Sequence, residues 1–240
     1  MRDLNYQLKQ LGVRNRDGSY ATQSKRAYLL SQIANQLHEL GFRGMSARSL
    51  KEKHIEALLK LWSEQKLGVG TIKNRMSALR WWAEKVSKHS VIAKGNDHYG
   101  IARRRYVGGE SKARDIDAEQ LARITDPYTQ LSLQLQREFG LRREESIKFI
   151  AQYADRGEQL ELKPSWTKGG KARCIPIRTQ QQRELLTQIV ELVGSGSLIP
   201  ADMSFIQQLR RYVRQVMNAG LSRMHGLRHQ YAQQCYRELT

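Results

Sequence analysis

The sequence lacks the features that mark membrane, secreted and zinc-binding proteins. No stretch approaches the roughly eighteen uninterrupted apolar residues that a membrane-spanning helix needs, and the opening MRDLNYQLKQLG has no apolar signal-peptide core. The two cysteines, Cys174 and Cys235, show neither CxxC nor Cys/His ligand spacing, which argues against a disulfide framework and a zinc site. We expect both to be small buried residues in a soluble intracellular protein.

Acidic residues are scarce relative to basic ones. The chain has 41 Lys+Arg against 23 Asp+Glu, a formal net charge of +18. Residues 1–113 hold 22 basic and 9 acidic residues (net +13), and residues 114–240 hold 19 and 14 (net +5). Such an excess predicts a polyanionic partner, gripped mainly by the N-terminal half. No Asp/Glu set suited to two metal ions is evident, so the sequence favours chemistry without metal or other cofactor.

The 240 residues contain no low-complexity tract and suffice for two small domains. The predicted fold is mainly α with one small β-hairpin. We expect a helical N-terminal domain over residues 1–93, a basic linker over 94–113, where glycines interrupt all periodicity, and a mixed α+β domain over 114–240. The RRRY stretch of the linker places Arg103, Arg104 and Arg105 where they could follow a phosphate backbone, although a solvated charge run is the simpler alternative.

Apolar spacing in the N-terminal domain predicts a small bundle of helices. One helix is expected over residues 22–40, a second after Ser49, and a third with Thr71 as its cap. The third would bury one stripe and leave Lys73 and Arg80 on another face, where they are candidates for contact with the polyanion, which would be DNA if the partner is a nucleic acid.

In the second domain, Asp117 is expected to cap one helix, and Asp126 followed by Pro127 another that ends at Gly140. Residues 158–163 and 172–177 alternate like the strands of a hairpin. Further helices are expected over 179–193, 204–219 and 225–239.

Three stretches of this domain carry basic residues that structure alone does not require. They are GLRREES (140–146), TKGGKAR (167–173) and HGLRH (225–229), and they supply Arg142, Lys168, His225 and Arg228. Arginine forks match the non-bridging oxygens of a phosphodiester and offset the charge of its transition state. A lysine at a hairpin tip can protonate a departing sugar oxygen, and a histidine one helical turn from an arginine can hold a phosphate oxygen or move a proton.

These motifs, in this order, resemble those of the tyrosine recombinases of phages and mobile elements. The resemblance implies that Arg142, Lys168, His225 and Arg228 are catalytic and that Glu145 positions the first arginine. It also implies a SAM-like DNA-binding domain at the N-terminus, a covalent 3′-phosphotyrosine intermediate without cofactors, and a homotetramer on double-stranded DNA in the cytoplasm of a bacterium, associated with its nucleoid.

Some assignments have alternatives. Arg142 could serve only to pair with an acidic neighbour on a surface turn. Lys171, rather than Lys168, could meet the phosphate, and in any case is a candidate for contact with DNA. His229, rather than His225, could face the site.

The family pattern also requires a nucleophilic tyrosine some thirty residues beyond the second arginine, where this sequence has already stopped. Tyr231 and Tyr236 share a predicted helix with Arg228, and we expect them to be packing residues. The sequence therefore predicts a chain, shortened at its C-terminus, that binds duplex DNA without cleaving it. The alternatives are a regulatory or architectural protein derived from an integrase and, less favoured, a relative of type IB topoisomerases.

Overall fold

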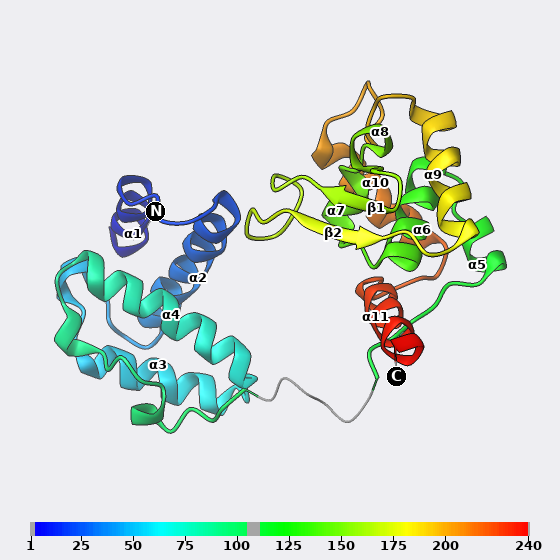
Figure 1. Ribbon diagram of the computed structural model, residues 1–240. Coiled ribbons are helices and arrows are strands. Elements are labelled where there is room, and N and C mark those ends of the chain that lie inside the picture. Colours follow the sequence, from blue (N-terminus) through cyan, green and yellow to red (C-terminus); the bar gives the residue numbers. More distant parts are fainter. Residues whose placement is uncertain (1–2, 105–110, 240) are drawn as a thin grey trace. The chain divides into compact units, whose positions relative to one another are not determined.

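The computed structural model describes residues 3–104 and 111–239, which form two compact units, Met1–Gly108 and Gly109–Thr240. Figure 1 shows a first unit made of helices and a second that adds a short two-stranded sheet, which confirms the predicted fold class. Arg105 lies outside the described residues. Within the described ranges, no helix is both long enough and apolar enough to cross a membrane.

The first unit is a four-helix bundle with short 3-10 turns. Its elements are α1 (Asp3–Arg14), α2 (Tyr20–Glu39), η1 (Ala47–Ser49), α3 (Glu52–Glu64), α4 (Val69–Lys85), η2 (His89–Val91) and η3 (Asp97–Tyr99). Trp62 and Trp82 are completely buried in its core, and their ring N–H groups donate to Gln36 Oε1 at 2.9 Å and to the Ala47 carbonyl at 2.8 Å. The core is therefore apolar and still satisfies its buried indole donors.

Three features of this unit differ from the expectations. Helix α1 was not predicted, although Leu4 and Leu8 bury one side of it. Helix α4 begins at Val69 with Gly68 as N-cap, so Thr71 lies inside the helix and does not cap it. Ile101, within the segment expected to be a linker, is buried in the core of this unit.

The second unit is built around α6 (Pro127–Phe139). Its other elements are α5 (Ala118–Ala122), α7 (Arg143–Ile147), α8 (Ala151–Ala154), β1 (Gln159–Leu162), β2 (Arg173–Pro176), α9 (Gln180–Val193), α10 (Phe205–Asn218) and α11 (His225–Leu239). Strands β1 and β2 pair antiparallel with Leu162 opposite Arg173. Leu131 and Leu135 of α6 pack with the sheet and α9, whereas Leu133 packs with α10 and α11, so α6 lies between two apolar clusters.

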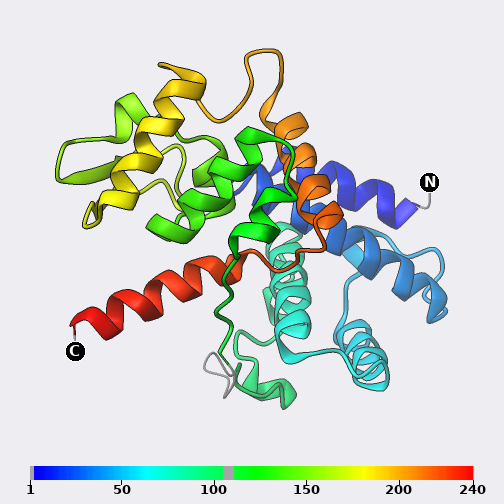
Figure 2. The same ribbon diagram turned by 90° about the vertical axis from the view of Figure 1, so that its right-hand side faces the viewer.

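Both ends of α6 form as the sequence predicts. Asp126 accepts a hydrogen bond from the Thr129 N–H at 3.0 Å, Pro127 occupies the first turn, and Gly140 ends the helix in the left-handed conformation with φ 58°. Helix α11 packs against α6, and in Figure 2 its far end extends away from the rest of this unit.

The cysteine prediction was wrong. Cys174 is exposed and Cys235 is only partly buried. On β2 the side chain of Ile175 points into the core, so that of its neighbour Cys174 must point outward, because successive strand residues alternate between faces.

Candidate anion-binding site

The second unit brings three arginines around one buried carboxylate. The Glu145 side chain is only 1 % exposed, and its Oε1 lies 2.6 Å from Arg142 Nη1. Its Oε2 accepts the Arg142 backbone N–H and Arg173 Nη2, both at 2.8 Å. The turn after Gly140 positions this set, since Arg142 is the N-cap of α7 and Glu145 closes a capping box on it.

Arg228 enters the site from α11. Its Nη1 donates a hydrogen bond to the carbonyl of Gly140, the residue that ends α6. Burial, together with repulsion from Arg173 and Arg142, lowers the pKa of Arg228 below the ordinary arginine value. The three guanidinium groups therefore lie close enough to repel one another, and one carboxylate does not neutralise them.

His225 lies one turn before Arg228 on the same helix. Its ring contacts that of His229 edge to face, with centroids 5.2 Å apart, so the structure places both histidines together. Burial and then repulsion from His229, Arg228 and Arg142 lower the pKa of His225, which keeps its ring neutral near pH 7. An anion bound here would relieve the repulsion and favour the protonated ring.

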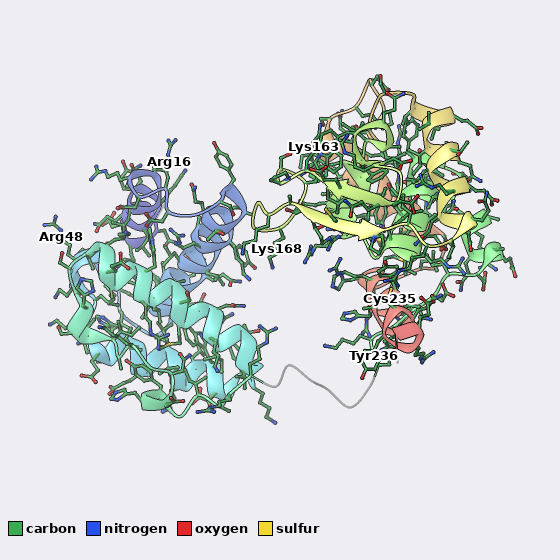
Figure 3. The ribbon with its side chains drawn as sticks, viewed as in Figure 1. Arg16, Arg48, Lys163, Lys168, Cys235 and Tyr236 are labelled. Carbon is green, nitrogen blue, oxygen red and sulfur yellow. The ribbon has the colours of Figure 1, made fainter. Side chains whose placement is uncertain are left out.

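Lys168 and Lys171 lie on the loop that joins β1 to β2. Both side chains are exposed, and Figure 3 shows Lys168 at the end of this loop. Within the described residues Lys168 makes no hydrogen bond or ion pair with the arginine cluster. The structure therefore unites Arg142, Glu145, His225 and Arg228 and leaves Lys168 on a separate, adjoining loop.

The tyrosines on α11 differ in their surroundings. The Tyr231 ring packs on Gly140, and burial raises its pKa to about 12, assisted by Cys235. Tyr236 is 71 % exposed and lies eight residues, or about 12 Å of helix rise, beyond Arg228. Tyr231 therefore lies near the arginines with a raised pKa, which opposes ionisation of its hydroxyl, and Tyr236 lies away from them.

Sequence reasoning missed two sets of basic residues. Arg173 belongs to the TKGGKAR stretch but was given no role, and only its return to Glu145 reveals one. Arg210 and Arg214 of α10 line a groove of about 400 Å³ with Arg143, Val213 and Met217, and these three arginines have no ion-pair partner among the described residues. The spacing of four between Arg210 and Arg214 is the signal that could have revealed this second basic face.

The proposed contacts of the first unit are placed as follows. Lys73 lies partly buried on α4, and Arg103 and Arg104 are exposed, the latter over the start of α4 at Gly70. Arg80, in contrast, donates to the carbonyls of Ala93 and Gly95 and to the Asn96 side chain. Arg80 thus holds the chain after α4 in place. This is a structural role, whereas the sequence pattern had suggested contact with DNA.

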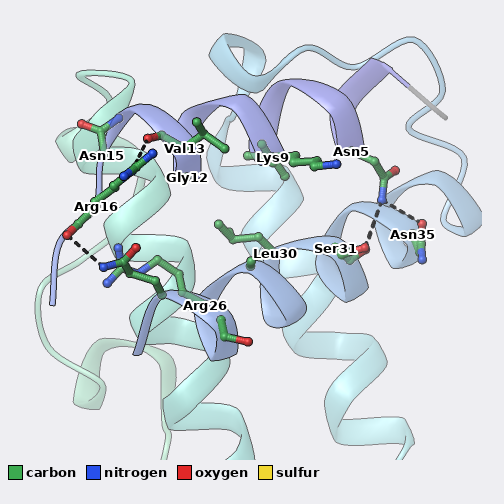
Figure 4. Close-up of a pocket in the computed structure, with 14 residues that line it drawn as sticks. Asn5, Lys9, Gly12, Val13, Asn15, Arg16, Arg26, Leu30, Ser31 and Asn35 are labelled. Carbon is green, nitrogen blue, oxygen red and sulfur yellow. Dashed lines mark hydrogen bonds between the residues drawn. The ribbon is translucent and has the colours of Figure 1, made fainter. Parts of the chain in front are cut away.

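A groove of the first unit lies between α1 and α2 (Figure 4). It has a volume of about 660 Å³ and an apolar floor that includes Leu8 and Leu30. Asn5 donates to Asn35 at 3.1 Å at one end, and Arg16 and Arg26 lie at the other. None of the candidate catalytic residues lines it.

The chain thus consists of a helical unit followed by a mixed unit that carries a cluster of arginines and histidines, and its net charge is strongly positive. Residues 1–91 match the family model described as phage integrase, N-terminal, and residues 101–234 match the model described as integrase. Because the second match spans more than half of the chain, the protein belongs to the integrase family, whose tyrosine-recombinase motifs the sequence carries.

Solved structures of integrases and recombinases share the fold. A lambda integrase dimer bound to a COC′ core site has a TM-score of 0.66 at 16 % identity, covering 99 % of this chain and 91 % of that one. The XerH site-specific recombinase bound to difH has a TM-score of 0.59 at 16 % identity, with 98 % and 74 % covered. The Tn1549 transposon integrase in complex with circular intermediate DNA gives 0.59 at 13 %, with 99 % and 88 % covered. No match was found among curated protein sequences.

Proposed function

We propose that this integrase binds duplex DNA and holds one backbone phosphate against Arg142, Arg228 and His225. The observation that carries the proposal is the cluster of three arginines around the buried carboxylate of Glu145, because the part of the chain that the structure describes supplies no second carboxylate to this cluster. A phosphodiester supplies the missing negative charge, and its non-bridging oxygens match the forks of the guanidinium groups.

In this proposal the cluster also supports the strand-exchange reaction of the family, in which a tyrosine hydroxyl attacks the phosphorus, a 3′-phosphotyrosine bond forms and the bond to the 5′ oxygen breaks. Arg142 and Arg228 stabilise the extra negative charge of the transition state, because they are in place before the attack. Lys168 protonates the departing 5′ oxygen from the loop between the strands, where its side chain is exposed. We expect this chain by itself to hold the DNA without cutting it, since Tyr231 has a raised pKa and Tyr236 lies eight residues beyond Arg228. We further propose that copies of the protein assemble on DNA as a tetramer in the cytoplasm, as the recombination of two sites requires.

The proposed DNA-binding surface extends beyond the phosphate clamp, which consists of Arg142, Arg228 and His225. The arginines lining the α10 groove would meet neighbouring phosphates, and Lys73, Arg103 and Lys171 would add contacts from other elements. Each phosphate neutralised releases counterions, so the affinity should fall steeply as salt rises.

The test is equilibrium binding of the full chain to a fluorescent duplex selected from a random pool, measured by anisotropy. Removing one charged hydrogen-bonding fork by Arg142→Ala or Arg228→Ala should weaken binding about tenfold. The matched control is Arg123→Ala, which removes the same charge from an exposed pair with Glu119 and should have little effect. Equal losses for all three variants would show that only net charge matters and would refute the clamp.

A second candidate is a protein that occupies recombination sites without cutting them. It is favoured by Tyr231, whose raised pKa of about 12 and contact with Gly140 make it a poor nucleophile. The test is incubation with nicked duplex followed by a denaturing gel. A covalent adduct that disappears in Tyr231→Phe or Tyr236→Phe would exclude this candidate, and binding without an adduct would support it.

A further inference from the structure

Arg173 occupies a position that no motif assigns. It is the first residue of β2, paired across the hairpin with Leu162, and it follows directly after the loop that carries Lys168 and Lys171. Its Nη2 lies 2.8 Å from Glu145 Oε2, and Arg142 Nη1 lies 2.6 Å from Glu145 Oε1. One buried carboxylate therefore connects the base of the loop to the first arginine of the clamp.

The surroundings of Arg173 are unfavourable for a residue with only a structural task. Its Nε is buried without a hydrogen-bond partner among the described residues, and its charge is among the causes that lower the pKa of Arg228. A buried unsatisfied donor and a repelled neighbour both oppose folding. Packing alone would be served better by a neutral side chain.

Arg173 limits the number of hydrogen bonds that Glu145 can accept from the Arg142 side chain. A carboxylate can accept two parallel hydrogen bonds from a single arginine fork. With Arg173 on Oε2, Arg142 has only Nη1 on Oε1, and its side chain remains 37 % exposed. Without Arg173, Glu145 Oε2 would keep only the backbone N–H of Arg142, and it could then accept a second hydrogen bond from the Arg142 fork and draw that fork away from a phosphate.

We propose that Arg173 is a positioning residue that shares Glu145 with Arg142 and so keeps the Arg142 guanidinium available to a DNA phosphate. It acts through Glu145 and does not itself contact the phosphate. It also fixes the start of β2, and with it one end of the loop that carries Lys168. The inference rests on the proposed function, because it assigns the availability of Arg142 to phosphate binding.

A double-mutant cycle on the full chain tests this role, with the selected fluorescent duplex at fixed salt. We expect Arg142→Ala and Arg173→Ala each to weaken binding about tenfold, and the double variant to be no weaker than the stronger single one, since both remove the same contact. A loss near a hundredfold in the double variant would mean that the two arginines act independently, and would overturn the proposal.

Two conservative variants separate positioning from charge. Arg173→Lys keeps the charge and can still occupy Glu145 Oε2, so it should restore affinity to within about threefold of the unsubstituted chain. Arg173→Gln keeps a donor without the charge and should fall between lysine and alanine. If lysine and glutamine both bind as poorly as alanine although they are folded by circular dichroism, the proposal fails. These two variants also carry the test if Arg173→Ala does not fold.

The outcomes also distinguish this inference from the proposed function. If the unsubstituted chain binds no duplex, or if Arg142→Ala binds as tightly as the unsubstituted chain, the proposed clamp fails and the inference falls with it. If Arg142→Ala weakens binding and Arg173→Ala does not, only the inference is refuted. Arg123→Ala again controls for the loss of one positive charge.

Discussion

Gly140 lies where α11 packs against the end of α6, and replacing it by alanine gives a quantitative test of this packing. Gly140 has φ 58°, and a Cβ placed there would overlap Cδ1 of the Tyr231 ring, far inside van der Waals contact. The left-handed backbone should cost about 1–2 kcal/mol for alanine. Overpacking against the tyrosine ring should cost a further 1–3 kcal/mol or so. We expect Gly140→Ala to lower the free energy of unfolding of the second unit by about 2–5 kcal/mol.

Gly220 provides the matched control. It has φ +72°, and a Cβ at this position would meet no atom of the described residues within 4 Å. Gly220→Ala should therefore lower the free energy of unfolding only by the backbone cost of about 1–2 kcal/mol. The difference between the two variants measures the clash, which should shrink when Gly140→Ala is combined with Tyr231→Ala.

Urea unfolding followed by tryptophan fluorescence is the assay. Trp166 is the one tryptophan of the second unit, whereas Trp62, Trp81 and Trp82 belong to the first, whose transition should not move. A difference below about 0.5 kcal/mol between Gly140→Ala and Gly220→Ala would refute the packing of Tyr231 on Gly140, since independent surface changes fall within that range. Gly140→Ala should also weaken DNA binding, because Arg228 is anchored to the same glycine.

Two other predictions concern charge. The pKa of His225 is lowered from its ordinary value of 6.5, so the free protein holds a neutral ring at pH 7 and a bound phosphate should draw in a proton. DNA affinity should consequently rise as the pH falls from about 7.5 to 5.5. This rise in affinity should be smaller in His225→Gln and should persist in the control His89→Gln. An unchanged pH profile in His225→Gln would contradict the assignment of His225 to the phosphate site. Glu145→Ala leaves two guanidinium groups without a counter-charge and should lower the free energy of unfolding by about 3–5 kcal/mol, against at most about 1 kcal/mol for exposed Glu119→Ala. Equal losses in thermal or urea unfolding would count against the burial of Glu145.

Much of the fold was predictable because its signals are local. The start of α6 at Asp126 and Pro127 and its end at Gly140 rest on hydrogen bonds and backbone angles within a few residues. The hairpin and the last three helices were predicted for the same reason, to within two residues at each end. Helix α1 was not predicted, because its apolar stripe is short. Leu4 and Leu8 have helical spacing, but too few apolar residues repeat at this spacing to distinguish a helix from a loop.

The sequence by itself determined the family motifs, the excess of positive charge and the chemical character of the site, since all three depend only on residue types and their order. Tertiary structure decided which of the many arginines act together. Arg80 bonds to backbone carbonyls thirteen and fifteen residues away, and Arg173 reaches a carboxylate 28 residues earlier in the chain. An arginine finds such partners only where the folded chain returns to it, so no local pattern separates Arg173 in the cluster from Arg80 in its structural place.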